Sequence, residues 1–431
     1  MNSNKWKLSG YSNIFNNVAW MIFDKVIILA LNLLVTVKIA NYYGAEDYGT
    51  YQYIVSLVAL FEILVAFVDG RVVKKKYVDY QPENVVTNAT FCRIFFSIIS
   101  VLVAVVYMVA AEQDRQFSVM LFLLILKSVL INLRFGFANR YEYLLKSRKI
   151  VIAADIGACL GAIMELCAVR MKLPITAIAV ISLLQSGINL LIIVIQYKHD
   201  FTRLFGKTLD QVLIKEMVKE SFPLAIAASC ATIYTRCDSV MIGSMLNQTE
   251  VGIYSISIKL ISIVQIVLIP IRESVYPRLI RLYNEDRVKY EREYIKISSI
   301  MTWLYIIGVS ISFIVLPNIF DVLNKEYMPA LSIYRIHVLG TFFMYNAILR
   351  AGHFTLTGDG RILALVQFIS VIVNVFLNIV GIHLLGTVGA AVSTVVTQGI
   401  SLMLSNVLFE GEGRKVFKWQ IRALNPLEIF N

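Results

Sequence analysis

The sequence predicts an all-α polytopic membrane protein, in which about twelve transmembrane helices form two parallel six-helix lobes around a central cavity. Composition is the first observation: of 431 residues, 58% are hydrophobic and 16% are charged, and the mean hydropathy is +0.70. A soluble domain is about 25% charged. Long apolar runs are the second observation, and a motif that occurs in both halves of the chain is the third. Together they exclude an ordinary soluble enzyme.

Apolar stretches long enough to cross a bilayer follow one another along the chain, since each span needs about 20 mostly apolar residues. The first stretch follows Lys5 and Lys7. It is too long for the apolar region of a signal peptide and has no small-residue cleavage site behind it, so it is a retained span. Pro270 lies inside the eighth stretch, where a proline can kink a helix. We expect the spans at residues 18–40, 47–69, 85–110, 117–139, 150–169, 174–197, 220–245, 250–275, 294–316, 330–349, 361–383 and 387–409.

Lysine and arginine are distributed unevenly between the two sides of these spans. If the N-terminus is cytoplasmic, most of them fall in cytoplasmic segments such as 71–76, and the opposite loops carry only Arg115, Arg170, Lys172 and Lys325. Basic loops resist translocation, so this pattern predicts an even number of spans and places both termini in the cytoplasm. The net charge of +11 is therefore mainly a topology signal. A nucleic-acid partner is not expected.

The sequence contains no pattern typical of a catalytic or metal site. Its five cysteines lie in apolar stretches without CxxC pairs or metal-type spacing, and no nucleotide-binding, hydrolase or metalloprotease motif occurs in a usable context. We therefore expect a transporter, with no cofactor and no metal. A membrane-embedded glycosyl- or acyltransferase would need clustered acids or a catalytic histidine at the membrane surface, but His337 and His353 have no visible partner in the sequence.

Basic residues within the predicted spans outnumber acidic ones. A charge near the bilayer centre costs about 2.5–3.5 kcal/mol on insertion scales, so such residues face a water-filled cavity, pair with each other or bind substrate. We expect the basic residues to line one cationic cavity that binds substrate: Lys25, Arg236, Lys259, Arg93, Lys127, Arg134 and Arg335. The acidic ones are candidates for coupling transport to an ion: Asp24, Glu62, Asp155, Glu165 and Asp238. For any single residue, an interhelical ion pair that only fixes the packing is an open alternative.

Helical spacing groups some of these charges and separates others. Lys127 and Arg134 are seven residues apart, so they share one face of the fourth span. Arg236 and Asp238 are two residues apart and point to different sides of the seventh span, so they cannot simply neutralise each other. Small residues such as Gly389, which opens the last span, are expected to allow close helix packing.

A short motif occurs at the start of both the second and the eighth span. Residues 47–51 and 250–254 share the pattern acid-x-Gly-x-Tyr, and six spans separate the two copies. Because six is even, both copies have the same orientation, which implies two six-helix lobes related by an axis along the membrane normal. We place the lobes at residues 1–210 and 211–431, the second with a short cytoplasmic tail. The glycines of the two copies should occupy equivalent places.

The stretch 40–51, Ala-Asn-Tyr-Tyr-Gly-Ala-Glu-Asp-Tyr-Gly-Thr-Tyr, resembles the signature of Wzx-type polysaccharide (O-antigen) repeat-unit flippases of the MOP exporter superfamily. The similarity recurs at 234–243 and 251–254 and extends over essentially the whole chain. It implies a MOP/MATE-like fold that moves undecaprenyl-diphosphate-linked oligosaccharide from the cytoplasmic to the periplasmic leaflet of a bacterial inner membrane by alternating access. A cationic interior suits this substrate, since a diphosphate needs positive charge to leave the headgroup region.

The resemblance also implies partners. These are the lipid-linked oligosaccharide, membrane lipids, an H+ or Na+ counter-ion and the polysaccharide polymerase machinery of O-antigen and lipopolysaccharide biosynthesis. The alternative within the same superfamily is a cation-coupled antiporter of drugs or other small molecules. That function would require interior acids to outnumber accessible bases.

Overall fold

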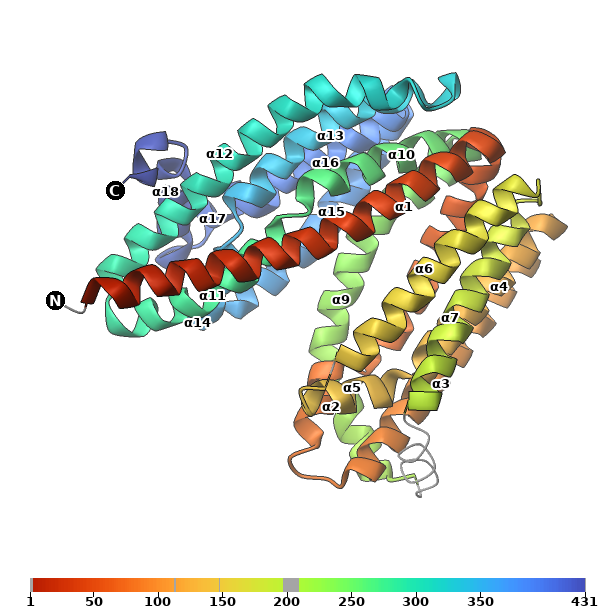
Figure 1. The fold of residues 1–431 in the computed structure, drawn as a ribbon, viewed down its shortest axis with the longest axis horizontal. Coiled ribbons are helices and arrows are strands. Elements are labelled where there is room, and N and C mark those ends of the chain that lie inside the picture. The colour runs from red at the N-terminus through yellow and green to blue at the C-terminus, as the bar shows by residue number, and fades with distance from the viewer. Residues whose placement is uncertain (1–2, 112–113, 147, 197–208, 431) are drawn as a thin grey trace. The chain divides into compact units, whose positions relative to one another are not determined.

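The computed structural model describes residues 3–111, 114–146, 148–196 and 209–430, with side chains from residue 29 onward except that of residue 149. Within these ranges every regular element is a helix, as the sequence predicts. The chain forms two compact units, which are described separately (Figure 1). The N-terminal unit is Lys38–Gly243, and the C-terminal unit is Ser244–Asn431 together with Met1–Val37.

The N-terminal unit is a bundle of long helices with short helices at one end. Helix α4 packs on α3 and α7, and α6 packs on α7. Short α2 and α5 cover α3 around a core that includes Val73, Val86 and Phe137. The elements are α1 (Ser3–Phe61) from Lys38 onward, η1 (Glu62–Phe67), α2 (Gly70–Lys76), α3 (Pro82–Ala110), α4 (Arg115–Leu133), α5 (Phe135–Tyr143), α6 (Arg148–Arg170), α7 (Thr176–Gln196) and α9 (Gln211–Met245) up to Gly243.

The C-terminal unit is built around α13, which packs on α10, α12 and α16, while α15 packs on α16. Its elements are α10 (Gln248–Gln265), α11 (Leu268–Glu285), α12 (Arg287–Phe320), η2 (Lys325–Tyr327), α13 (Pro329–Asn346), α14 (Arg350–Leu356), α15 (Gly360–Leu385), α16 (Thr387–Gly399), the π-helical η3 (Ile400–Leu404), α17 (Ser405–Leu408), α18 (Glu412–Arg422) and η4 (Pro426–Ile429).

Nine helical stretches in the described part of the chain are long and apolar enough to cross a membrane, which makes this a multi-pass membrane protein. They match nine of the twelve expected spans. The seventh and tenth expected spans are also helical, as α9 and α13. Neither is both long enough and apolar enough to count among these nine stretches. The first expected span lies in the early part of α1, where side chains up to residue 28 are outside the description.

Backbone breaks separate spans where the sequence predicts a boundary. Gly44 interrupts α1 at φ 77° and ψ 176°, a conformation that favours glycine, and it falls between the expected first and second spans. In the second half, Asn247 is an extended N-cap that ends one helix and starts α10. Gly49 and Gly252 each follow their break by five residues. The repeated motif therefore lies at the same distance from a backbone break in both halves of the chain, and the equivalence of the two glycines stays a prediction.

The eighth expected span, 250–275, falls within the apolar helical stretch Gln248–Glu285, but a turn interrupts it. Helix α10 ends at Gln265 and α11 starts at Leu268. Pro270 lies in the first turn of α11, where a proline is tolerated because its missing N–H would have no partner. Helices are also interrupted between α1 and α2, between α4 and α5, and between α13 and α14, and in each of these cases the second helix is short.

Helix α9 packs with the N-terminal unit, although the predicted lobe boundary at 210/211 assigns its sequence to the second lobe. Leu213 and Met217 of α9 are fully buried in the core of α2, α3 and α5. The backbone N–H of Asp69 donates to Ser221 Oγ at 3.0 Å. Lys76, whose side chain is 5% exposed, is paired with two carboxylates of α9. The boundary between the compact units therefore differs from the boundary between the two copies of the repeat. The division into lobes at 210/211 stays a prediction.

Candidate functional site

A polar cavity of about 500 Å3 lies inside the N-terminal unit, and we call it the inner chamber. It is enclosed by η1, α3, α4 and α9. Four charged side chains line it, two acidic (Glu62 and Asp69) and two basic (Arg93 and Arg236). The polar lining is completed by Asn132 and by the hydroxyl groups of Ser229, Thr232 and Thr235. This lining can hydrogen-bond a polyhydroxylated or anionic group within apolar spans.

A second polar cavity of about 490 Å3, the outer chamber, shares part of this lining. Both chambers are lined by Asp69, Arg93, Ile131 and Asn132. The outer chamber is otherwise formed by α2 and α5, with the polar side chains Arg71, Lys74, Arg134, Asn139 and Glu142. Arg93 is therefore the cation common to both spaces.

Local helix geometry explains how these side chains meet. Ser229, Thr232 and Arg236 are spaced i, i+3 and i+7 on α9, which places them on one face. At Glu62 the first long helix tightens into the 3-10 turn η1. Asp69 is the N-cap of α2, and its Oδ1 accepts from Arg71 N at 2.7 Å. Breaks at helix ends thus bring short polar segments to the chambers.

Neutral side chains hold the guanidinium groups of Arg93 and Arg134, which both line the outer chamber. The Arg93 guanidinium lies 3.8 Å from the centre of the Phe135 ring, and its buried Nε has no hydrogen-bond partner. Arg134 Nη1 donates to Asn189 Oδ1 at 2.9 Å. Within the described residues neither arginine forms an ion pair. Glu62 interacts electrostatically with Lys127 as well as with the two inner-chamber arginines.

The structure brings four of the seven predicted basic residues into one region. Arg93, Arg134 and Arg236 line the chambers, and Lys127 lies near Glu62. Lys259 is half-buried on α10 and Arg335 is exposed on α13, both in the C-terminal unit. Lys25 lies outside the described side chains. A single cavity lined by all seven stays a prediction.

The predicted acidic residues have different environments. Glu62 lines the inner chamber, and Glu165, half-buried on α6, interacts with Lys127. Asp155 is also half-buried on α6, and Asp24 lies outside the described side chains. Asp238 is buried, with an oxygen 3.6 Å from Cys237 Sγ, whereas Arg236 is exposed. These two residues thus point to different sides of α9, as their spacing predicts.

Sequence reasoning missed the neutral polar residues of the chambers. Asn132, Ser229 and Thr232 received no role, although their positions on otherwise apolar spans were a usable signal. Asp69 and Asn139 are the last residues of the second and fourth expected spans and received no role. Among the described residues, no group of three His, Cys, Asp or Glu side chains is placed to hold a metal ion.

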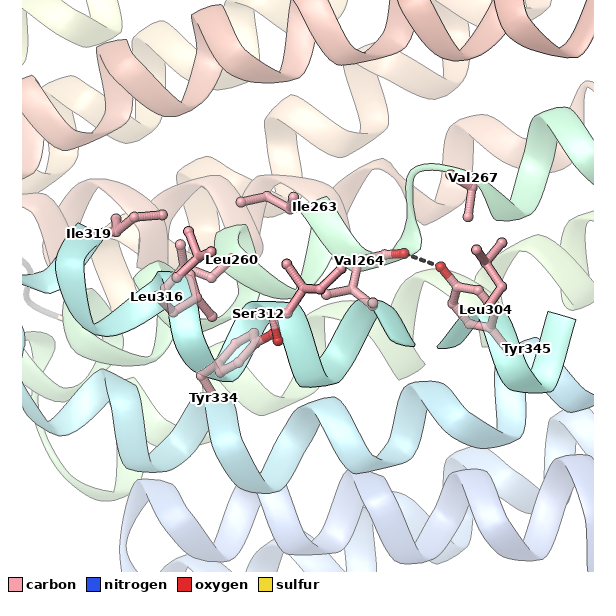
Figure 2. Close-up of a pocket in the computed structure, with 13 residues that line it drawn as sticks. Leu260, Ile263, Val264, Val267, Leu304, Ser312, Leu316, Ile319, Tyr334 and Tyr345 are labelled. Carbon is pink, nitrogen blue, oxygen red and sulfur yellow. Dashed lines mark hydrogen bonds between the residues drawn. The ribbon is translucent and has the colours of Figure 1, made fainter. Parts of the chain in front are cut away.

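The C-terminal unit contains an apolar pocket of about 320 Å3 between α10, α12 and α13. Figure 2 shows its lining of aliphatic side chains with two tyrosines. Both tyrosine hydroxyls are already used: Tyr345 donates to the Val264 carbonyl, and Tyr334 to Ser312 Oγ at 2.7 Å. The pocket fits hydrocarbon and offers no free hydroxyl to a polar headgroup.

The expectation that His353 lacks a partner is wrong. Its Nδ1 lies 2.8 Å from the Tyr290 hydroxyl and its Nε2 lies 3.1 Å from Glu412 Oε2. The ring is also packed against Trp419, with centroids 5.0 Å apart. Burial lowers the pKa of His353. With both nitrogens occupied and the ring enclosed, His353 ties α14 to α12 and α18 and presents no free base to a substrate.

Comparisons with solved structures show the fold. The chain is similar to an inward-facing multidrug resistance MATE family transporter of the MOP superfamily, with a TM-score of 0.72 and 11% identity over 92% of this chain and 95% of that chain. It is also similar to the lipid II flippase MurJ in an inward closed conformation, with a TM-score of 0.71 and 12% identity over 94% and 91% of the two chains. A MOP superfamily transporter from Pyrococcus furiosus, described by a reverse polarity of its binding pocket, has a TM-score of 0.59 and 11% identity over 94% and 96%.

Sequence comparisons agree with this fold. Residues 14–283 match the polysaccharide biosynthesis protein family, and residues 223–380 match the MatE family. No curated protein matches the sequence. The predicted fold class, an all-helical membrane protein of the MOP and MATE type, is confirmed. Because its match covers more than half of the chain, the protein belongs to the polysaccharide biosynthesis protein family.

Proposed function

We propose that the protein is a Wzx-type flippase, which moves undecaprenyl-diphosphate-linked polysaccharide repeat units from the cytoplasmic to the periplasmic leaflet of a bacterial inner membrane by alternating access. One observation carries the proposal: Arg93, Arg134 and Arg236 line the chambers within or at the ends of apolar spans and form no salt bridge among the described residues. Together the chambers have more basic than acidic side chains: Arg71, Lys74, Arg93, Arg134 and Arg236 against Glu62, Asp69 and Glu142.

Each part of the substrate has a matching environment. Guanidinium groups bind phosphate oxygens through paired N–H donors, and Arg93 is held by ring stacking with its Nε unused. Sugar hydroxyls can exchange hydrogen bonds with Asn132 and with the hydroxyls of α9. The polyprenyl tail stays in the lipid. Family membership in polysaccharide biosynthesis supports a glycan as cargo.

Substitution of the cationic residues tests this function. We expect Ala at Lys25, Arg236 or Lys259 to abolish surface polysaccharide at normal protein level, and Lys→Arg at positions 25 and 259 to retain part of it. Arg170→Ala makes the same charge change at an exposed site and should leave display intact. The readout is surface polysaccharide in a deletion strain, together with the lipid-linked precursor that accumulates on the cytoplasmic side. Full display by all three Ala variants would contradict the proposal.

A cation-coupled small-molecule antiporter is the second candidate, because Glu62 lines the inner chamber and the MatE family matches part of the chain. In that case Glu62→Gln should abolish drug resistance conferred by the protein, while surface polysaccharide is unaffected. The flippase proposal expects the reverse pattern for Arg93→Ala: loss of polysaccharide and unchanged drug susceptibility. H+ or Na+ remains the proposed counter-ion in both cases, with Glu62 as the candidate coupling carboxylate in the described cavity.

A further inference from the structure

We propose that the outer chamber is a separate binding site for a phosphate-bearing anion, formed by Arg134 and Arg93 with Arg71 and Lys74 at its edge. The inference rests on the proposed function only for the source of the anion, which is then the diphosphate of the lipid-linked substrate. The sequence alone assigned the basic residues of α2 only a role in topology. Here they become part of a binding surface.

The charge of the chamber carries the first step. Four basic side chains, Arg71, Lys74, Arg93 and Arg134, line it with two acidic ones, Asp69 and Glu142. Both acids already have partners, since Asp69 pairs with Arg71 at 2.9 Å and Glu142 with Lys74 at 2.9 Å. The chamber therefore keeps an excess of two basic side chains over acidic ones. Arg93 and Arg134 are half-buried and form no salt bridge among the described residues, although Asp69 and Glu62 act on Arg93 electrostatically. Guanidinium groups in this setting favour an added anion, because solvent screens them poorly.

The second step is that Arg93 and Arg134 are already oriented before an anion binds. Arg134 follows the last residue of α4 and is oriented by its bond to Asn189. Arg93 is fixed by its contact with Phe135, the first residue of α5. An arginine that is already oriented loses less conformational entropy on binding an anion. The neutral partners leave most guanidinium donors available.

A further polar part of the chamber wall lies where α2 and α5 meet. A Cβ on Gly70 would lie 2.4 Å from Asn139 Oδ1, so α2 and α5 touch closely at this point. Asn139 Nδ2 donates to the Phe135 carbonyl at 2.9 Å, which fixes the amide against the start of α5. Polar side chains therefore line one part of a space of about 490 Å3, which is large enough for a diphosphate group.

Inorganic pyrophosphate is the probe for a direct test. The full-length protein in phosphatidylcholine nanodiscs is titrated with pyrophosphate by calorimetry at fixed ionic strength. We expect Arg134→Gln to weaken binding about tenfold, as expected for loss of one charge-assisted contact, and Arg134→Lys to recover part of the loss. Arg140→Gln is the matched control, because Arg140 stacks on Tyr77 and Tyr143 and lines neither chamber. It should bind as the wild type does.

A variant of the inner chamber separates the two sites. Arg236→Gln should keep pyrophosphate affinity within about twofold of the wild type, because Arg236 lines only the inner chamber. Equal affinity of wild type and Arg134→Gln would overturn the inference, as would loss of binding by Arg236→Gln alone. Thermal unfolding of each variant shows that it is folded. Failure of the flippase assignment has a different signature: a deletion strain that still displays polysaccharide.

Two sources of the anion can be distinguished by native mass spectrometry. Retention of phosphatidylglycerol by the wild type and not by Arg134→Gln would identify a phospholipid headgroup. Retention of geranylgeranyl diphosphate in excess phosphatidylglycerol, with the same loss in the variant, would identify a lipid diphosphate. Both results support the phosphate site, whereas equal retention of both lipids by the variant contradicts it.

Discussion

Gly389→Ala should destabilise the C-terminal unit, because α15 and α16 approach each other there with backbone in direct contact. A Cβ on Gly389 would lie 1.8 Å from the carbonyl oxygen of Gly381 and 2.2 Å from its carbonyl carbon. An ordinary carbon to oxygen contact is about 3.3–3.6 Å, so the two helices must separate by roughly 1.5 Å. Backbone atoms cannot rotate out of the way as a side-chain end does.

The free energy of unfolding should fall by about 3 kcal/mol, which is the upper end of the range for overpacked cores. At about 2.1 cal/mol/K per residue, this loss lowers the midpoint by about 3 °C if the whole chain unfolds together, and by about 6 °C if the C-terminal unit unfolds alone. Size-exclusion chromatography of a fluorescent fusion after heating measures this midpoint.

Gly308→Ala is the matched control for this prediction. Gly308 is also a helical glycine of the C-terminal unit, but nothing lies within 4 Å of a Cβ built there. Alanine at a compatible helical position is stabilising by up to about 1 kcal/mol, so the midpoint should stay the same or rise. If Gly389→Ala unfolds at the wild-type temperature, close approach at this glycine is not required and the packing argument is refuted.

Three further predictions follow from other contacts. Lys76→Met should lower the unfolding midpoint by a few degrees, since it leaves the two α9 carboxylates side by side, and neutralising both with Gln should restore part of it. Burial lowers the pKa of His353, so the folded state binds fewer protons than the unfolded state and stability falls as pH drops through about 6.5. The midpoint should therefore fall from pH 7.5 to 5.5 in the wild type and less in His353→Gln; an equal fall would show that other groups cause it. A reporter that works only in the cytoplasm should be active when it is fused within residues 71–76, and a reporter that works only in the periplasm should be inactive there. Activity of the periplasmic reporter would overturn the topology.

Local sequence was sufficient to predict the helices and most of their limits. Apolar runs of the right length identify spans because every backbone polar group in a bilayer must be satisfied within a helix. The break at Gly44 was also predictable, since a positive φ favours glycine. The break after α10 also had a local signal, because Pro270 cannot donate to the carbonyl of Ile266 and its ring crowds that carbonyl.

Only the tertiary structure decided which charges meet. Arg93, Arg134 and Arg236 come from three different helices, and helical periodicity gives the face of each residue but not the neighbour opposite it. His353 and Glu412 are likewise brought together from separate helices. The placement of α9 in the N-terminal unit depends on contacts of Leu213 and Met217 with distant segments. Composition alone determined that the chain crosses a membrane, because transfer free energies add along a segment, whereas a cavity exists only where several segments fail to fill the space between them.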